Sequence, residues 1–132
     1  MATWLFAAAM LKGQPIKVFN HGNMRRDFTF IEDIVQGIKA GLFEARLSPY
    51  EVFNLGNHSA ENLKDMIHTL GAALGVEPKM EFLPMQPGDV EATYADITLA
   101  KAKLGFEPKT GIAEGLPIFA AWFKDYQQGS RL

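Results

Sequence analysis

A strand, a helix and a second strand are expected in immediate succession between residues 28 and 55, and this order limits the folds open to the chain. Residues 28–31 and 50–55 are rich in aromatic and β-branched side chains, which favour strands. Between them, apolar residues recur at helical spacing: Ile34, Val35, Ile38 and Leu42. Such a succession within about 30 residues is typical of a right-handed βαβ crossover. The sequence therefore predicts a mixed α/β fold with one βαβ unit.

About five helices are expected in all, joined by short strands. Besides the helix after Glu32, helices are expected after Thr3, after Ser59, over residues 97–104 and after Thr110. Glycines end three of them: Gly13, Gly75 and Gly105. Further strands are expected over residues 16–19 and 79–83. Pro117 lies inside the last helix and predicts a kink or a late start there.

Length and composition narrow the class of protein. With 132 residues, 48% of them apolar and 21% charged, the chain is expected to form one globular domain over residues 1–132. A formal charge of −2 disfavours broad nucleic-acid binding, and the absence of cysteine excludes disulfides and thiolate metal sites. The apolar start of the chain has no cationic flank and is far shorter than the ~20 residues of a bilayer span. We therefore expect a cytoplasmic location and no membrane partner.

Two consecutive arginines begin the first polar stretch that can bind a ligand. The planar guanidinium of Arg26 can hold a phosphate through two parallel hydrogen bonds. The alternative is that Arg26 only pairs with a carboxylate such as Asp27 or Asp33. The residues alone leave both interpretations open.

The second stretch is a turn-rich loop over residues 86–90, with the sequence Gln-Pro-Gly-Asp-Val. Its Asp89 can accept hydrogen bonds from the hydroxyls of a ligand, or it only stabilises an Asx-type turn. Taken with the aromatic Phe19 on the strand at 16–19, Arg26 and Asp89 suit a ligand that carries phosphates, a flat base and vicinal hydroxyls. A nucleotide-linked sugar has all three.

Other chemistry-bearing motifs are few. The three histidines are scattered, and none stands four residues from another, so we expect no metal site. The sequence contains neither the glycine-rich fingerprint of dinucleotide binding nor that of a P-loop.

Several motifs, in sequence order, resemble the carboxy-terminal, substrate-binding half of the NAD-dependent nucleotide-sugar epimerases and dehydratases. These enzymes belong to the extended short-chain dehydrogenase/reductases. The motifs are GQPIKVFNHG at 13–22, RDFTFIEDIV at 26–35, VFNLG at 52–56, MQPGDV at 85–90, TYAD at 93–96 and LGF at 104–106. The MQPGDV and FNHG stretches are most similar to the UDP-glucuronate 4-epimerase branch.

The resemblance implies roles for five residues. It places Arg26 on the diphosphate and Asp89 on the ribose hydroxyls, while Phe19 and its neighbour Lys17 fall on the strand that meets the uracil. Gln86 stands where related galactose epimerases carry a second phosphate-binding arginine. Because a glutamine supplies no charge, the affinity for phosphate is expected to depend more on Arg26.

The resemblance also implies what the chain lacks. In this family the NAD-binding glycine turn and a catalytic Tyr-x-x-x-Lys pair lie in the amino-terminal half. None of the tyrosines here, Tyr50, Tyr94 and Tyr126, is followed by lysine four residues later. We therefore expect no cofactor and no catalytic residue in this chain, although the intact family uses NAD, and we expect the chain to be inactive alone.

Two functions remain open. The first is the UDP-sugar-binding portion of a 4-epimerase, with UDP-glucuronate or UDP-galacturonate as its ligand. The second is a non-catalytic module, a truncated remnant that self-associates or docks to a separately encoded Rossmann half. The intact family packs part of this region against its Rossmann sheet, so an apolar patch would be exposed without it.

Overall fold

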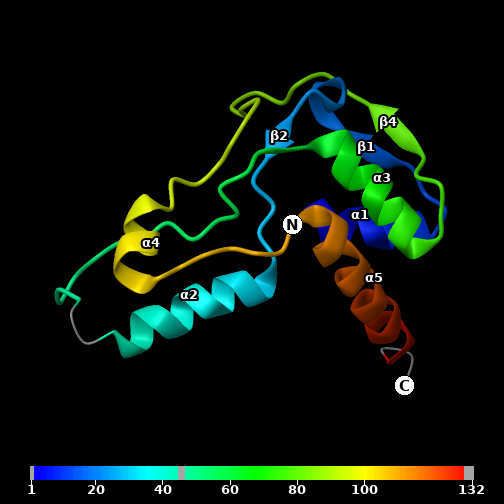
Figure 1. Ribbon diagram of the computed structural model, residues 1–132. Helices are drawn as coiled ribbons and strands as arrows, with labels where there is room; N and C mark the ends of the chain where they lie inside the picture. The colour runs from blue at the N-terminus through cyan, green and yellow to red at the C-terminus, as the bar shows by residue number, and fades with distance from the viewer. Residues whose placement is uncertain (1, 45–46, 130–132) are drawn as a thin grey trace.

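The computed structural model describes residues 2–44 and 47–129. Within that part of the chain, five helices, one 3₁₀ turn and four short strands follow one another (Figure 1). In order they are α1 (Ala2–Leu11), β1 (Ile16–Val18), the 3₁₀ turn η1 (Phe19–Gly22), β2 (Arg25–Arg26), α2 (Ile31–Phe43), β3 (Glu61–Asn62), α3 (Leu63–Leu74), β4 (Met80–Phe82), α4 (Thr98–Leu104) and α5 (Ile112–Gly129). The predicted mixed α/β class with five helices and short strands is confirmed.

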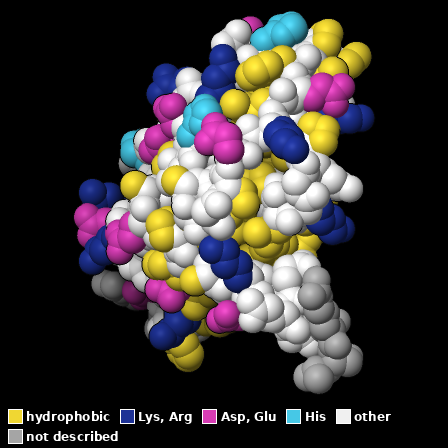
Figure 2. All heavy atoms as spheres, turned by 90° about the vertical axis from the view of Figure 1, so that its right-hand side faces the viewer, with side chains coloured by type: hydrophobic (Ala, Val, Ile, Leu, Met, Phe, Trp, Pro, Cys, Tyr) yellow, Lys and Arg dark blue, Asp and Glu magenta, His cyan; other side chains and the backbone are white. Residues whose placement is uncertain are grey.

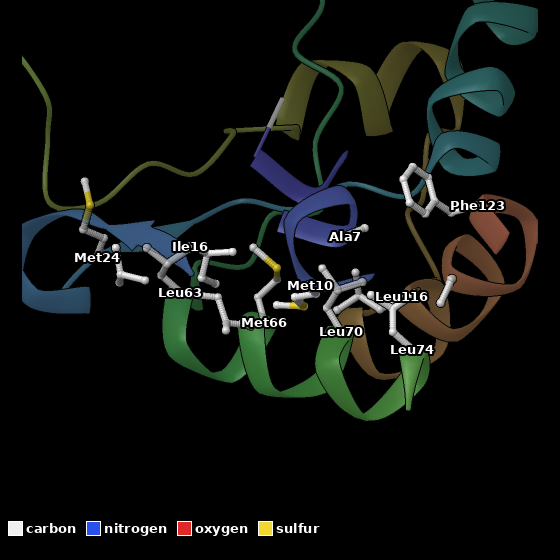
Figure 3. Packing of buried hydrophobic residues seen from close by; sticks show 13 residues of the cluster. Ala7, Met10, Ile16, Met24, Leu63, Met66, Leu70, Leu74, Leu116 and Phe123 are labelled. Atoms are coloured by element: carbon white, nitrogen blue, oxygen red, sulfur yellow. The ribbon is translucent and has the colours of Figure 1, made fainter. Parts of the chain in front are cut away.

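The apolar face of α3 holds the main core together. All the apolar residues that its helical spacing placed on one face are buried: Leu63, Met66, Ile67, Leu70 and Leu74. Figure 3 shows the labelled side chains of α3 turned toward α1 and β1, and the same cluster includes Ala7, Met10, Ile16, Leu116 and Phe123. Burying a large aliphatic side chain contributes about 1.5–3 kcal/mol. This cluster therefore supplies most of the driving force that the described chain has for folding.

The strands form two small sheets rather than the expected βαβ unit at 28–55. β1 pairs in parallel with β4, with Ile16 opposite Met80 and Val18 opposite Phe82, so α2 and α3 lie between the paired strands in sequence. β2 and β3 form an antiparallel pair of two residues each, too short to leave a sequence pattern. Residues 28–30 and 50–55 belong to no strand. Aromatic and β-branched residues favour strands only where a neighbouring strand satisfies their backbone.

Three predicted helix ends also differ from the structure. Asn62, not Ser59, caps α3, because its side chain accepts a hydrogen bond from the Lys64 N–H at 2.9 Å. Thr3 lies inside α1, which already includes Ala2. α5 begins at Ile112 and continues through Pro117, so the helix does not start late, and the kink expected as the alternative stays a prediction. The glycine stops are confirmed at Gly75 and Gly105, whose φ angles of 75° and 61° are left-handed.

A second, smaller cluster lies under α2 and α4, which stand apart from the other helices in Figure 1. Its buried members are Ile97, Ala100 and Phe106. Gly37 lets α2 approach it closely, since a Cβ there would lie 2.7 Å from Leu55 and 2.9 Å from Phe106. α4 begins after Asp96, whose carboxylate accepts the Thr98 hydroxyl at 2.6 Å. That hydrogen bond, with the one from the Thr98 N–H, lowers the pKa of Asp96 below its ordinary value.

The surface carries charges of both signs. Figure 2 shows the side formed by α3, β4 and α5, where basic side chains lie among acidic ones. Among the helices of residues 2–44 and 47–129, none is long and apolar enough to span a bilayer.

Two leucine-to-alanine substitutions test this division between core and surface. Leu70 is fully buried in the main core, whereas Leu42 on α2 is 73% exposed. We expect Leu70→Ala to lower the free energy of unfolding by about 2–5 kcal/mol, because it removes buried methyl groups and leaves a cavity. The matched Leu42→Ala should change it by less than about 0.5 kcal/mol. Urea unfolding followed by circular dichroism measures both, and equal losses would contradict the packing described here.

Candidate functional site

A partly open hollow lies between α1, the two small sheets and the loop after β4. Its volume is about 160 Å³, and it is lined by Ala2, Phe6, Lys17, Phe19, Met24, Arg26, Phe28, Leu63 and Asp89. Four of the five residues singled out in the sequence lie here: Lys17, Phe19, Arg26 and Asp89. Gln86 does not line the hollow, although it stands at the start of the turn that carries Asp89.

β1 and β2 direct the side chains of Lys17 and Arg26 toward the hollow. In β1 Ile16 and Val18 point into the core, so the alternation of a strand leaves Lys17 exposed between them. Phe19 follows at once in η1 and is half-buried. Arg26 ends β2, where its pairing with β3 holds the backbone. Lys17 and Arg26 therefore reach the hollow from two different sheets, and Phe19 reaches it from the turn after β1.

A tight turn carries Asp89. The Asp89 N–H donates to the Gln86 carbonyl at 3.2 Å, and Gly88 has a φ of 82°, which favours glycine at the third position of a turn. One carboxylate oxygen of Asp89 accepts the N–H of the next residue, Val90, at 2.9 Å, whereas the Asx-type turn that the sequence left open would use the N–H two residues on. The same oxygen accepts the Arg26 Nη2 at 2.8 Å. Asp89 is thus both a turn residue and part of the hollow.

The carboxylate partner of Arg26 is Asp89, not Asp27 or Asp33 as the sequence alternative supposed. Those two aspartates accept backbone N–H groups instead. A second guanidinium nitrogen, Nη1, donates to the Arg25 carbonyl at 2.9 Å, which fixes the plane of the group. The side chains of Arg26 and Asp89 are 23% and 33% exposed. An incoming anion can therefore reach the guanidinium from solvent.

Sequence reasoning missed the apolar half of the hollow. Phe28 stands two residues beyond Arg26, on the side of the chain that a strand alternation assigns to Arg26, and this spacing could have identified it. Phe6 of α1 and Leu63 of α3 reach the hollow from elements far away in sequence, so only the tertiary packing brings them there. The result is two cations and one carboxylate set beside three aromatic rings.

No group of three or more metal-binding side chains occurs among the described residues. The hollow itself offers a different chemistry. Its cations bind anions, its carboxylate accepts hydrogen bonds from hydroxyls, and its rings present flat apolar faces. These groups suit the binding of a ligand that has anionic, hydroxylated and planar parts.

Comparison with known proteins identifies similar chains. The family model described as GDP-mannose 4,6 dehydratase matches residues 3–118. An uncharacterized protein of Methanocaldococcus jannaschii is 45% identical over 93% of this chain and 37% of its own length. UDP-glucuronate 4-epimerase 4 of Arabidopsis thaliana is 38% identical over 99% of this chain and 33% of its own.

A solved structure agrees with these sequence matches. The UDP-glucuronic acid 4-epimerase of Bacillus cereus, in complex with UDP-glucuronic acid and NAD, superposes with a TM-score of 0.87 and 30% identity. The match covers 96% of this chain and 40% of that protein. This chain therefore spans about a third to two fifths of the length of the relatives it matches.

A double-mutant cycle tests the ion pair in the free protein. Because both side chains are partly exposed, we expect the coupling free energy between Arg26→Gln and Asp89→Asn to be at most about 1 kcal/mol. Urea unfolding of the wild type, both single variants and the double variant gives this value. It should fall as salt is added. A coupling of several kcal/mol that salt does not change would show that the pair serves the fold rather than a ligand.

Proposed function

The chain belongs to the nucleotide-sugar epimerase and dehydratase family described as GDP-mannose 4,6 dehydratase, and from this premise we propose that its hollow binds the uridine diphosphate part of a UDP-sugar. The observation that carries the proposal is the meeting of Lys17, Phe19, Arg26 and Asp89 in one hollow. These four residues lie up to 72 positions apart in the sequence. UDP-glucuronate and UDP-galacturonate are the proposed ligands, since epimerases of the former are among the relatives.

The diphosphate is proposed to lie on Arg26. A guanidinium held by the Arg25 carbonyl presents its remaining donors in a fixed plane, which matches the oxygens of a phosphate. In the free chain one of those donors, Nη2, donates to the Asp89 carboxylate. A diphosphate, with its greater charge, would compete for the donor and release the Asp89 carboxylate toward the ribose hydroxyls. Arg26 and Asp89 thus exchange one partner for another when the ligand binds.

The uracil is proposed to lie against Phe19, beside Lys17. The apolar rings of Phe6, Phe19 and Phe28 give the hollow a surface on which a planar base can stack. Gln86, at the start of the Asp89 turn, is proposed to make an uncharged contact with the ligand at the rim.

The hollow is too small for a whole nucleotide sugar. Its volume of about 160 Å³ lies below the ~300 Å³ at which ligand pockets usually begin. We therefore propose that the sugar, NAD and the groups that transform the sugar are held by protein outside this chain. The three tyrosines, none followed by lysine four residues on, agree with that division.

Replacing Arg26 by glutamine tests the binding proposal. Following the amide signals of the wild-type chain by NMR, we expect UDP at millimolar concentration to shift the signals of Arg26 and Asp89, and uridine to shift them less. Arg26→Gln removes a charge-assisted hydrogen bond of about 1.5–3 kcal/mol, so the UDP affinity should fall by roughly ten-fold or more.

The matched control is Lys101→Gln, which removes one positive charge from exposed α4, outside the hollow. It should leave the affinity for UDP unchanged. If millimolar UDP shifts no signal around the hollow of the wild-type chain, the binding proposal is wrong.

A second candidate function, a docking module, is favoured by the outer face of α2. Ile31, Val35, Ile38 and Leu42 follow one another at helical spacing, and all are exposed, by 65%, 44%, 51% and 73%. Residues 50–55 alternate between exposed and half-buried side chains, like a strand without a partner in the described chain, and their Leu55 lies close to Gly37 of α2. An apolar helix face next to a bare strand edge is typical of an interaction surface. We propose that the protein portion that holds NAD covers it.

Charged substitutions on α2 test this surface. Without its partner, the chain should associate with itself through the exposed face, and sedimentation velocity at rising concentration should detect this. The double substitution of Ile38→Glu with Leu42→Glu should abolish the association. Ile118→Glu, at a similarly exposed apolar position on α5, is the control that should not. A wild-type chain that stays monomeric and binds no hydrophobic dye would contradict the docking function.

A further inference from the structure

We infer that Asp27 is the positioning residue of the proposed nucleotide site: it fixes the loop over residues 89–95 beside β2 and thereby sets Asp89 against Arg26. The inference rests on the proposed function for its effect on UDP, but its structural half is independent of any ligand. Asp27 does not line the hollow, and its side chain is directed at backbone groups.

The carboxylate of Asp27 accepts four hydrogen bonds. One oxygen accepts the Thr29 hydroxyl at 3.1 Å and the Asn57 N–H at 2.7 Å. The other accepts the His58 N–H at 3.1 Å and the Ala95 N–H at 2.9 Å. An ionised carboxylate has about four acceptor sites and no donor, so this group is saturated. Three of the four donors are backbone groups of two segments that are distant in sequence.

Glycine at position 56 leaves room for this arrangement. A Cβ on Gly56 would lie 2.9 Å from a carboxylate oxygen of Asp27 and 2.4 Å from the Cβ of Ala95. Both distances are shorter than real Cβ contacts allow, so no larger residue fits without a shift. The carboxylate is therefore enclosed closely by the two segments that it binds.

The loop over residues 89–95 touches the β2 region at every second residue. Asp89 pairs with Arg26, the Glu91 carbonyl accepts the Arg25 N–H at 2.8 Å, and the Thr93 N–H donates to the Arg25 carbonyl at 3.1 Å. The Ala95 N–H ends the series on Asp27. Asp27 is thus the far anchor of the loop. When an extended segment slips by one residue, each of its side chains turns to the opposite face. By holding the loop in register, this anchor therefore directs the Asp89 side chain toward Arg26.

Asp33 offers a matched control. It is also an aspartate, 8% exposed, that accepts two backbone N–H groups, from Lys109 and Thr110, each at 3.1 Å. It fastens the chain before α5 to α2, and neither of the segments it joins lines the hollow. Loss of either carboxylate charge weakens a loop attachment, but only the loss at Asp27 should disturb the Arg26–Asp89 contact.

The experiment compares Asp27→Asn with Asp33→Asn in the full chain, with two measurements on each. In the free protein, the Arg26 Nη2–H signal of the wild type, from the nitrogen that donates to Asp89, should be shifted from that of a free arginine and slow to exchange. Asp27→Asn should move it to the free-arginine position, and Asp33→Asn should not. With UDP as the probe, Asp27→Asn should weaken binding about three- to ten-fold, whereas Asp33→Asn should leave it within two-fold.

The outcomes separate the two proposals. If the Arg26 signal is unchanged in folded Asp27→Asn, or changes equally in both variants, the positioning role is wrong. If the signal responds as expected but UDP does not bind the wild type, the proposed function fails and the positioning role stands. Should Asp27→Asn not fold, Thr29→Val, which removes one of the four hydrogen bonds, takes its place. Its Arg26 signal must then move in the same direction, by a smaller amount, or the role is overturned.

Discussion

Burial of the apolar face of α3 is the constraint on which the rest of the structure depends. α1, α5 and β1 all contribute buried side chains to the cluster around that helix, and Trp4 of α1 also packs against Trp122, Phe123 and Tyr126 of α5. Two strands of three residues would not be stable in water by themselves. They persist because Ile16 and Val18 are buried against α3, which in turn leaves Lys17 exposed at the hollow. The position of a cation at the surface is thus a consequence of packing in the core.

Two buried or partly buried carboxylates hold loop segments together by accepting backbone N–H groups. Asp27 and Asp33 each join segments that are separated by at least 30 positions, and they do so without pairing with a cation. With both occupied in this way, Asp89 is the carboxylate that meets Arg26. A partly exposed pair of this kind contributes little to stability. The contact of Arg26 Nη1 with the Arg25 carbonyl holds the guanidinium in place, and such preorganisation would lower the ordering cost of binding the proposed ligand.

The outer face of α2 differs from the apolar face of α3, because its apolar side chains are exposed. Its apolar residues have the spacing of a buried stripe, yet Asp33 and Gly37 are the buried ones and the stripe faces solvent. Each apolar side chain left in water forgoes about 1.5–3 kcal/mol. The proposed docking surface lies on this exposed stripe.

Local sequence determined most of the helices. The period of α3, the glycines after α3 and α4 and the buried stripe of α5 follow from side-chain spacing and from the left-handed backbone that glycine tolerates. The family motifs likewise singled out Lys17, Phe19, Arg26 and Asp89, which the tertiary structure brings to one hollow. Tertiary structure alone decided which strands pair, because residues 28–30 and 50–55 have strand-like side chains but belong to no strand of the described chain. It also decided that Asp89 is the partner of Arg26 and that Asp27 accepts backbone N–H groups. These contacts join residues 63 and 68 positions apart, and local sequence cannot predict them because packing sets the distances between such residues.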